Sequence, residues 1–515
     1  MQGGALDGRV SGVAFDSRAV RPGDLYVALP GAKTHGARFV ESVLGAGAAA
    51  VLTDAAGADM IAALPGPVAI PVLVVDDPRT AMATAAAEVY GRPATKLIML
   101  GVTGTNGKTT TSYLLDAGLR ATGRSTGVIG TLGYFLDGTE IAADRTTITT
   151  PESPDLQALL AMLVERGADA VVMEVSSHAL ALGRADEIVF DVAGFTNFGR
   201  DHLDFHGTVE AYFEAKAQLF TPERTRRVVI NTDDPRGPEL VSRAEAGGLP
   251  VTTTSLAGTE SGGGHNDRFR CLSYSDSDPV VVRIAAPQGE FTFRLGLTGS
   301  YNVANAVTAL AMLEAIGLDP RTAADGLAEV AVPGRLQRVD LGPDAPRAYV
   351  DFAHTPQALT SVLTELGRIL GDPAPRRTGR LICVVGCGGD RDRQKRDPMG
   401  RTAAELADIV IITDDNPRTE DPAAIRAAAL AGARRQAADG ARQVTVLDGG
   451  DRAAAIRQAL QSSQPGDVIA VLGKGHERGQ EVAGRVLPFD DAEQLVTAWR
   501  ECRRFGQQQK SENKS

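Results

Sequence analysis

Apolar residues occur along this chain in short, nearly unbroken runs that are separated by longer amphipathic stretches. Examples of the runs are KLIMLGVT at 96–103, ADAVVMEV at 168–175 and RLICVVGC at 380–387. Runs that do not alternate with polar residues are typical of parallel strands covered on both faces. Alanine-rich stretches such as 79–91 and 300–317 predict helices between them. The pattern therefore predicts an α/β protein with mostly parallel sheets.

The order of these elements divides the chain into three expected domains. A chain of 515 residues exceeds what one hydrophobic core usually organises. Residues 1–95 predict a small α/β domain. Residues 96–333 open with a strand, a glycine-rich turn and a helix, and they predict a central domain with a mostly parallel sheet. Residues 334–515 alternate strands with helices, which predicts a doubly wound, Rossmann-like domain.

Polar motifs follow three of the strands predicted for the last domain. They are GCGGDRD at 386–392, DDNPR at 414–418 and GKGHE at 473–477. Because ligands on doubly wound sheets bind outside the carboxyl ends of the strands, these motifs are expected to line one crevice. The alternative is a set of α/β layers without a shared site.

Composition and charge narrow the class of protein. The formal net charge is −11, which argues against a general nucleic-acid-binding protein because such proteins carry a basic face. The four cysteines form no CxxC pair, which indicates a reducing compartment. The first residues carry no apolar signal segment, and no run of ~18 apolar residues occurs. We therefore expect a cytoplasmic protein without membrane insertion.

A phosphate loop is predicted directly after the strand at 96–103. Its residues are Gly104, Thr105, Asn106, Gly107, Lys108, Thr109 and Thr110. Backbone N–H groups of such a loop cradle phosphate oxygens, while the lysine reaches the outer phosphates and the hydroxyl of Thr109 can hold Mg²⁺. Val102 departs from the strict pattern, which begins with glycine. The alternative is a glycine-rich turn with a solvated lysine, and the loop alone does not distinguish a motor, a kinase, a switch or a ligase.

The motifs around this loop resemble one family. In order they are GTNGKTTT, TTPES, MEVSSHAL, TNFGRDHLDFHG, YFEAKAQLF, YNVANA, PGRLQ, DFAHTP, DDNPR and GKGHE. Together they resemble the Mur ligases of peptidoglycan biosynthesis, and the resemblance extends from FDSR at 15–18 to the GKGHE motif. It implies an ATP-dependent ligase, expected to be monomeric, that uses Mg²⁺. The expected substrates are UDP-N-acetylmuramoyl-L-alanyl-D-glutamate and 2,6-diaminopimelate.

The resemblance also implies a metal-bearing centre beside the loop. Glu174 ends a predicted strand of the same sheet and suits Mg²⁺, as does Thr109. His202 matches a further metal-site residue of the family, and we assign it a catalytic role with Lys108. Lys216 has the pattern of an exposed helix lysine, but the matching lysine in the family is carbamylated. We therefore treat a carbamate on Lys216 as a hypothesis.

The remaining site residues are assigned to substrates by the resemblance. Those expected to bind the UDP group are Ser17, Arg18, Thr34 and His35; those for the muramoyl dipeptide are Thr149, Thr150, Ser176 and Arg184. Those for the incoming amino acid are Arg391, Asp415, Asn416, Arg418, Gly473 and Glu477, and those around the nucleotide are Asn302, Asn305, Arg335, Asp351 and His354. Leu182 and Asp397 depart from the family pattern, so the contacts near them are open. Taken alone, FDSR and DDNPR are equally compatible with polar turns.

Three other functions compete with this interpretation. A ligase that extends folate with glutamate would need neither a UDP-binding domain nor DDNPR. A lysine-adding ligase would leave Arg418 without a distal carboxylate to bind. A non-catalytic nucleotide-binding protein would be expected to lose Lys108, Glu174 or His202, and all of these are present.

Overall fold

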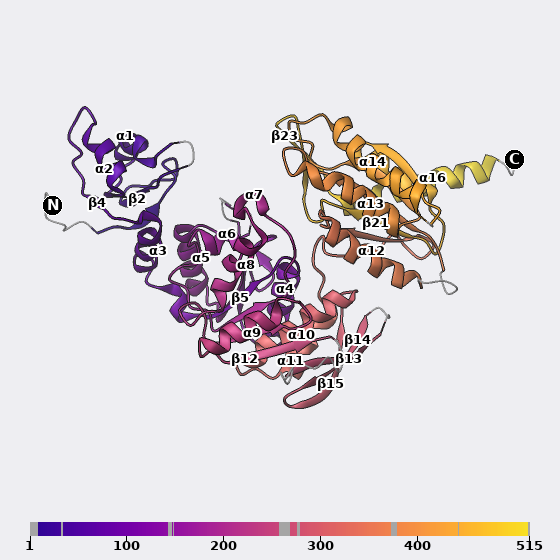
Figure 1. Cartoon of the computed structure of the whole chain (residues 1–515), viewed down its shortest axis with the longest axis horizontal. Helices are drawn as coiled ribbons and strands as arrows, with labels where there is room; N and C mark the ends of the chain where they lie inside the picture. The colour runs from indigo at the N-terminus through magenta and orange to yellow at the C-terminus, as the bar shows by residue number, and fades with distance from the viewer. Residues whose placement is uncertain are drawn as a thin grey trace. The chain divides into compact units, whose positions relative to one another are not determined.

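The computed structural model describes residues 9–31, 34–142, 147, 149–256, 268–275, 279–371, 378–440 and 442–512 (Figure 1). The chain forms two compact units. The first comprises Met1–Ser275, Val281–Leu295 and Tyr301–Val330, and the second comprises Asp276–Val280, Gly296–Ser300 and Ala331–Ser515. Each unit is built on sheets of its own, as an α/β protein of this length requires.

A four-stranded parallel sheet opens the first unit, in the order β1-β2-β3-β4. Its strands are β1 (Gly12–Ala14), β2 (Asp24–Ala28), β3 (Ala50–Thr53) and β4 (Val72–Val74), with η1 (Gly36–Phe39), α1 (Val40–Gly45), α2 (Ala55–Ala62), α3 (Pro78–Val89) and η2 (Pro93–Lys96). Successive residues of β2 enter different cores: Tyr26 packs with Val40, whereas Val27 packs with Met82. The sheet is therefore covered on both faces, which explains its nearly continuous apolar strands.

An eleven-stranded sheet forms the rest of the first unit, in the order β15-β14-β13-β12-β11-β10-β5-β9-β6-β7-β8. Its strands are β5 (Ile98–Thr103), β6 (Thr126–Gly130), β7 (Gly133–Leu136), β8 (Thr139–Glu140), β9 (Ala170–Glu174), β10 (Val192–Phe195), β11 (Val228–Asn231), β12 (Val251–Ser255), β13 (Phe269–Tyr274), β14 (Val280–Ala286) and β15 (Gly289–Leu295). The central strands pair in parallel, which confirms the predicted mostly parallel sheet. They are buried along nearly their whole length, whereas β14, which pairs antiparallel with β13, alternates buried and exposed residues, as a strand does where one face of the sheet is open to solvent.

Helices connect and cover these strands. They are α4 (Lys108–Ala121), α5 (Ser153–Glu165), α6 (Ser177–Ala181), α7 (Leu203–His206), α8 (Val209–Ala217), η3 (Gln218–Phe220), α9 (Gly237–Ala246), α10 (Ser300–Ala315), α11 (Pro320–Asp325) and η4 (Gly326–Glu329). The strand β5, the loop after it and α4 are the elements expected of a phosphate loop. β5 lies between β9 and β10, so the residues after all three strands meet at one edge of the sheet.

A six-stranded sheet organises the second unit, in the order β16-β17-β21-β18-β19-β20. Its strands are β16 (Gln337–Val339), β17 (Arg347–Asp351), β18 (Leu381–Cys387), β19 (Ile409–Asp414), β20 (Thr445–Gly450) and β21 (Val468–Leu472). All neighbouring pairs are parallel except β16 with β17. Because β21, β18 and β19 are neighbours, the three polar motifs that follow them share one edge, as predicted.

Helices cover both faces of this sheet, which confirms the doubly wound fold. The helices of this unit are α12 (Pro356–Leu370), η5 (Arg393–Lys395), α13 (Arg396–Leu406), α14 (Pro422–Asp439), α15 (Arg452–Ser462) and α16 (Asp491–Glu512), and a hairpin consists of β22 (Gly479–Val482) and β23 (Arg485–Pro488). α13 packs between α12 and α14, while α15 packs on α16. Ile456 of α15 and Leu495 of α16 share one core with Ile382 of β18.

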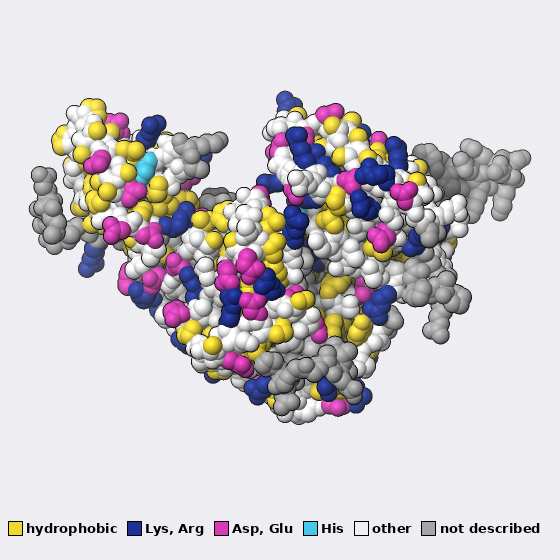
Figure 2. All heavy atoms as spheres, in the orientation of Figure 1, with side chains coloured by type: hydrophobic (Ala, Val, Ile, Leu, Met, Phe, Trp, Pro, Cys, Tyr) yellow, Lys and Arg dark blue, Asp and Glu magenta, His cyan; other side chains and the backbone are white. Residues whose placement is uncertain are grey.

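The surface bears no single field of basic charge on the face that Figure 2 shows, where acidic and basic side chains are interspersed. Within the described ranges, no helix combines the length and the apolar character that crossing a bilayer would require.

Candidate functional site

The phosphate loop is held by backbone geometry and by a neighbouring strand. Gly104 and Gly107 have φ angles of 155° and 85°, a region that favours glycine. A side chain on Gly104 would collide with Thr196, and one on Gly107 would lie 2.5 Å from Oδ1 of Asn305. The segment after β10 supports the loop, because the N–H of Thr105 donates to the carbonyl of Asn197 at 2.9 Å. The protein's own glycines and the segment after β10 therefore hold the backbone of the loop.

Two lysines converge on one carbonyl of this loop. Nζ of Lys108 donates to the carbonyls of Gly104 and Thr105 at 2.8 and 3.0 Å, and Nζ of Lys216 donates to that of Gly104 at 2.7 Å. Lys216 is only 1% exposed, so the expectation of an exposed helix lysine was wrong. Burial, and then the charge of Lys108, lower the pKa of Lys216 well below its ordinary value. The neutral amine of Lys216 is thereby favoured.

The buried face of α8 explains this error. Lys216 follows Tyr212 by four residues and Phe213 by three, so all three side chains lie on the same side of the helix. Its Nζ lies 4.7 Å from the centre of the Tyr212 ring, and the Tyr212 hydroxyl lies 3.2 Å from Oγ1 of Thr105. The helical spacing of Lys216 from Tyr212 and Phe213 was visible in the sequence. The carbonyl of Gly104, which accepts the hydrogen bond of Lys216, was not.

Thr109 and Glu174 meet at the end of β9. Oγ1 of Thr109 donates to Oε2 of Glu174 at 3.0 Å. Thr131, which sequence reasoning did not identify, donates its hydroxyl to Oε2 and its N–H to Oε1, both at 2.9 Å. Glu174 is 1% exposed. A hydroxyl and a carboxylate, both oxygen donors, are thus held beside the phosphate loop, a donor set that suits Mg²⁺.

A histidine cluster lies near this centre. The ring of His178 lies 4.7 Å from that of His202 and 5.4 Å from that of His206, whose Nε2 is 3.0 Å from Oγ of Ser177. Burial is the largest cause that lowers the pKa of His202; the charge of Asp201 opposes this shift and the charge of Lys108 adds to it. A neutral imidazole at pH 7 can bind a metal ion.

The predicted metal residues do not form a closed ligand set by themselves. Within the described part of the chain, no hydrogen bond or ion pair joins His202 to Glu174. The one group of three potential ligands that lie close together there is Glu210, Glu214 and Glu239, on the surface, where Arg236 and Arg243 pair with them. Thr109 and Glu174 are brought together as predicted, whereas His202 lies with the histidines.

The residues assigned to the dipeptide gather around the end of β9. Oγ1 of Thr150 donates to the carbonyl of Glu174 at 2.8 Å and accepts the N–H of Ser176 at 3.1 Å. Nη1 of Arg184 donates to the carbonyl of Thr150 at 3.2 Å. Thr149 lies close by, with its Oγ1 3.2 Å from that of Thr131.

A buried carboxylate in the same motif was missed. Glu152, which is 7% exposed, pairs with Nε of Arg184 at 2.8 Å and with Nη1 of Arg79 at 2.8 Å. Arg79 lies on α3 and Arg184 follows α6, so this one residue fixes side chains from two parts of the first unit. The carbonyl of Leu182 accepts a further hydrogen bond from Arg79 at 3.4 Å. Although Leu182 departs from the family pattern, its backbone carbonyl still contacts Arg79.

The residues assigned to UDP lie on loops after β1 and β2. Ser17 and Arg18 follow β1, while Thr34 and His35 follow β2. Arg18 pairs with Asp16 and is largely exposed. Nδ1 of His35 accepts the N–H of Ala37, and its Nε2 lies 3.0 Å from Oδ1 of Asp54. The parallel strands bring both loops to one edge, although His35 also has a structural role as the cap of η1.

The residues assigned to the nucleotide belong to both units. Asn302 and Asn305 lie on α10 in the first unit, buried at 2% and 5% exposure, with Asn305 beside Gly107. In the second unit, Oδ2 and Oδ1 of Asp351 accept the N–H groups of Leu336 and Ala353. Nearby, the guanidinium of Arg335 lies 4.6 Å from the centre of the Phe352 ring, and Nδ1 of His354 lies 2.8 Å from the Phe352 carbonyl. Burial raises the pKa of Asp351.

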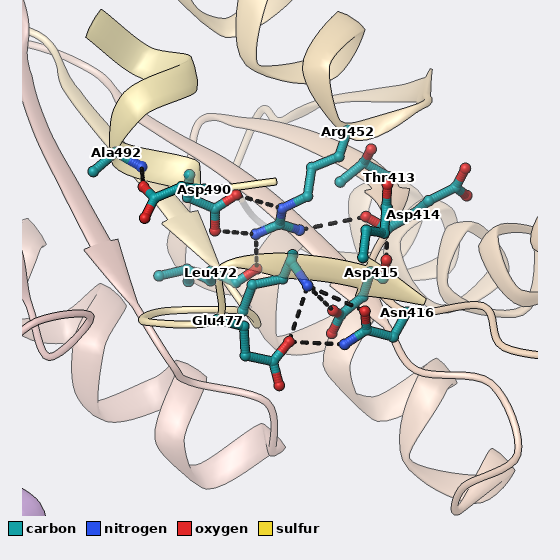
Figure 3. A network of polar contacts seen from close by, with 12 residues as sticks. Thr413, Asp414, Asp415, Asn416, Arg452, Leu472, Glu477, Asp490 and Ala492 are labelled. Carbon is teal, nitrogen blue, oxygen red and sulfur yellow. Dashed lines mark hydrogen bonds and ion pairs between the residues drawn. The ribbon is translucent and has the colours of Figure 1, made fainter. Parts of the chain in front are cut away.

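Three of the residues assigned to the incoming amino acid, Asp415, Asn416 and Glu477, meet where β19 and β21 end (Figure 3). Nδ2 of Asn416 donates to Oε2 of Glu477 at 2.8 Å. Asp415 is buried, and a side chain on Gly473 would approach its Oδ2 to 3.2 Å. Arg418 adopts a left-handed backbone with φ of 52°.

The guanidinium of Arg418 is held from two sides. Its Nη1 donates to the carbonyl of Gly389 at 2.7 Å, and its Nε lies 3.2 Å from Oε2 of Glu481. Arg391 is exposed in the loop after β18, close to Gly388. Asp397 lies in the first turn of α13, where it pairs with Arg435, so this departure leaves the helix intact.

This arrangement can bind phosphates, hold a divalent ion with oxygen ligands, and hold a polar substrate between a carboxylate and a guanidinium. Comparison with known proteins gives three family matches along the chain. The Mur ligase family, catalytic domain, matches residues 9–90; the Mur ligase middle domain matches 102–313; the Mur ligase, glutamate ligase domain, matches 334–475.

Relatives of one name align over nearly the full length. The UDP-N-acetylmuramoyl-L-alanyl-D-glutamate–2,6-diaminopimelate ligase of Streptomyces avermitilis is 50% identical over 489 residues, covering 94% of this chain and 91% of the relative. The ligase of the same name from Corynebacterium glutamicum is 45% identical, covering 95% of this chain and 92% of the relative. A solved structure of a ligase with this name has a TM-score of 0.66 at 31% identity, covering 96% of this chain and 95% of that one.

Proposed function

The chain belongs to the Mur ligase family, and we propose that it is an ADP-forming ligase that joins 2,6-diaminopimelate to UDP-N-acetylmuramoyl-L-alanyl-D-glutamate. The observation that carries the proposal is the full-length similarity to relatives of that name. The chemistry of the site agrees with it, because a phosphate loop lies in one unit and the Asn416–Glu477 pair with Arg418 in the other.

The reaction is proposed to proceed in two steps. The glutamyl carboxylate attacks the γ-phosphorus of ATP, the bond to the β–γ bridging oxygen breaks, and an acyl phosphate and ADP result. The amine of diaminopimelate then attacks the acyl carbon, an amide forms, and phosphate leaves with loss of a proton from the amine. Loop N–H groups and Lys108 stabilise charge on the transferring group. Arg184, held by Glu152, orients the dipeptide.

Thr109 and Glu174 would hold Mg²⁺, which neutralises phosphate charge when it is bound. Their oxygen atoms are already adjacent, and Thr131 fixes the carboxylate. We assign His202 to the same centre, with a pKa that burial keeps low.

A carbamate on Lys216 is proposed on the strength of its environment. Carbon dioxide adds to a neutral amine, forming an N–C bond and releasing a proton. Burial and the adjacent Lys108 favour that neutral amine. The product is an anion close to the ammonium group of Lys108, which contacts the same carbonyl of Gly104, and opposite charges at this distance attract.

We further propose a division of labour among three regions: residues 1–95 bind UDP, residues 96–333 bind ATP, and residues 334–515 bind the third amino acid. The protein is proposed to act as a cytoplasmic monomer. The sheets of each region have separate cores, which supports this division.

The test is ADP release by the purified chain with ATP and Mg²⁺. Release should require both the UDP-muramoyl dipeptide and diaminopimelate, supplied as the meso or LL isomer. Release with lysine in place of diaminopimelate would identify the lysine-adding alternative. Release with a folate and glutamate, without any UDP substrate, would identify the folate-extending alternative.

A further inference from the structure

A fully buried lysine lies where the loops after β19 and β21 meet. The side chain of Lys474 has 0% exposure. It lies between Gly473 and Gly475, which have φ angles of 115° and 56°. Lysine is rarely buried without partners, because transfer of an ammonium group out of water is costly. Its partners therefore indicate why it is there.

Among the residues that the structure describes, the close polar partners of Lys474 belong to the predicted amino-acid site. Nζ of Lys474 donates to Oε2 of Glu477 at 2.9 Å and to Oδ1 of Asn416 at 3.1 Å. It also lies 3.8 Å from Oδ1 of Asp415. Nδ2 of Asn416 donates to the same Oε2 of Glu477. The side chains of Lys474, Asn416 and Glu477 therefore form a closed ring of hydrogen bonds.

This ring of hydrogen bonds sets the orientation of the Asn416 and Glu477 side chains. Oδ1 of Asn416 also accepts the N–H of Glu481 at 2.9 Å, so its amide oxygen and nitrogen have separate, assigned partners. Both described hydrogen bonds to Glu477 go to Oε2. The side chain of Glu477 is 34% exposed, so Oε1 is the acceptor left for a ligand.

A second buried cation, the guanidinium of Arg452, contacts the backbone at the ends of β19 and β21. Nη2 of Arg452 donates to the carbonyl of Leu472 at 3.0 Å, and Nη1 reaches that of Asp414 at 3.5 Å (Figure 3). Asp491 balances the charge of Arg452. The two side chains, each with 0% exposure, form an ion pair at 2.7 Å. Arg452 therefore fixes the ends of the strands, whereas Lys474 contacts the functional side chains themselves.

The anion of this ring is Glu477. Burial raises the pKa of the neighbouring Asp415, which favours its neutral form, whereas Lys474 supplies one positive charge. Burial opposes ionisation of Glu477, but the charge and hydrogen bond of Lys474 lower its pKa. An ammonium group of a substrate would donate to Oε1 of this carboxylate, because both described hydrogen bonds of the ring go to Oε2.

We propose that Lys474 is a positioning residue for the incoming diamino acid: it holds the Asn416 amide and the Glu477 carboxylate so that Oε1 of Glu477 receives a substrate ammonium group. This inference rests on the proposed function, because it takes the third amino acid as the ligand of this site. It assigns to Lys474 a role in binding that amino acid and none in binding ATP.

The variant Lys474→Met tests it, because methionine retains the apolar stem and removes the ammonium group. The KM for diaminopimelate should rise ~10-fold or more, while the KM values for ATP and for the UDP-muramoyl dipeptide stay within ~2-fold. A KM for diaminopimelate that rises no more than the KM for ATP would overturn the inference.

A double variant separates positioning from folding. In K474M/E477Q, the lost cation is matched by a lost anion, and the glutamine oxygen can still accept from Asn416. Its thermal stability should recover relative to K474M, whereas the KM for diaminopimelate should stay raised at the value of E477Q alone, because Lys474 acts through Glu477. Recovery of both would mean that Lys474 acts only through stability, and would overturn the inference.

The ion pair of Arg380 with Asp467 offers a matched control. It lies at the start of β18 and β21, the opposite end of the same sheet, with a distance of 2.7 Å. Arg380→Met should lower stability without changing the KM for diaminopimelate. Failure of the proposed function would be seen in the wild-type protein, as no ADP release with diaminopimelate. If wild type accepts lysine instead, the same comparison is made with lysine, which is also a diamino acid.

Discussion

Nζ of Lys216 donates a hydrogen bond to the carbonyl oxygen of Gly104 at 2.7 Å, across 112 residues of sequence. Lys108 donates to the same oxygen at 2.8 Å. Burial and the adjacent charge of Lys108 lower the pKa of Lys216, so the neutral amine is favoured at this shared acceptor. This relationship leads to the first three predictions.

Replacement of Lys108 by methionine should lower kcat/KM by ~10³-fold or more, because the cation stabilises charge on the transferring phosphoryl group. The fold should persist, since the loop is held by glycines and by Asn197. ADP release and circular dichroism check both points. Lys96→Met, at an exposed lysine just before β5, is the control and should be fully active.

Removal of carbon dioxide should lower turnover if Lys216 carries a carbamate. Activity measured in degassed buffer should return when bicarbonate is added, and the intact protein should lose the mass of one carbon dioxide on brief acidification. Lys216→Ala should lower kcat by ~10²-fold and should not respond to bicarbonate. An unmodified mass in fully active protein contradicts the carbamate.

The pH dependence of stability should reveal the buried amine. Because burial lowers the pKa of Lys216 below 10.5, the unfolded chain binds a proton that the folded chain sheds. The free energy of unfolding therefore rises with pH between the folded pKa and 10.5. In carbon dioxide-free buffer, wild type should gain Tm relative to Lys216→Met as the pH rises toward 10.5. A gap that moves the other way would show that the amine is charged when folded.

Replacement of Glu174 by glutamine should raise the Mg²⁺ concentration needed for half-maximal activity by ~10-fold or more, because a charged oxygen ligand is lost. Saturating Mg²⁺ should restore part of the turnover. Glu239→Gln, in the surface carboxylate group, should leave the Mg²⁺ requirement unchanged. Equal effects of both variants would move the functional metal site away from Thr109 and Glu174.

Replacement of Arg418 by methionine should raise the KM for diaminopimelate by ~10²-fold, because the distal carboxylate loses its partner. Discrimination against lysine should fall at the same time. Arg401→Met, at an exposed arginine of α13, provides the control. A variant that keeps full preference for diaminopimelate would show that Arg418 does not determine specificity.

Much of the architecture could be predicted because burial imposes it locally. The uniformly apolar runs at β5, β9 and β18 predict parallel strands, and each strand is buried along most of its length. The polar motifs after β18, β19 and β21 share one sheet edge, since parallel strands end there together. The roles assigned to individual site residues stay predictions that the experiments above test.

Other features had weak signals or none. Glu152 lay within TTPES and Lys474 within GKGHE, yet nothing in the letters marks a carboxylate that pairs two arginines or a lysine with 0% exposure. Arg452 stands outside every recognised motif. Its burial depends on Asp491, which lies 39 residues further along the chain.

The sequence by itself determined the sheets, the phosphate loop and the order of the motifs, because hydrophobic periodicity and glycine conformation act over a few residues. Only the tertiary structure decided which charged side chains are buried and which atoms they contact. Lys216 illustrates the reason: its place on the apolar side of α8 is a local property, but the carbonyl of Gly104 that accepts its hydrogen comes from another part of the chain.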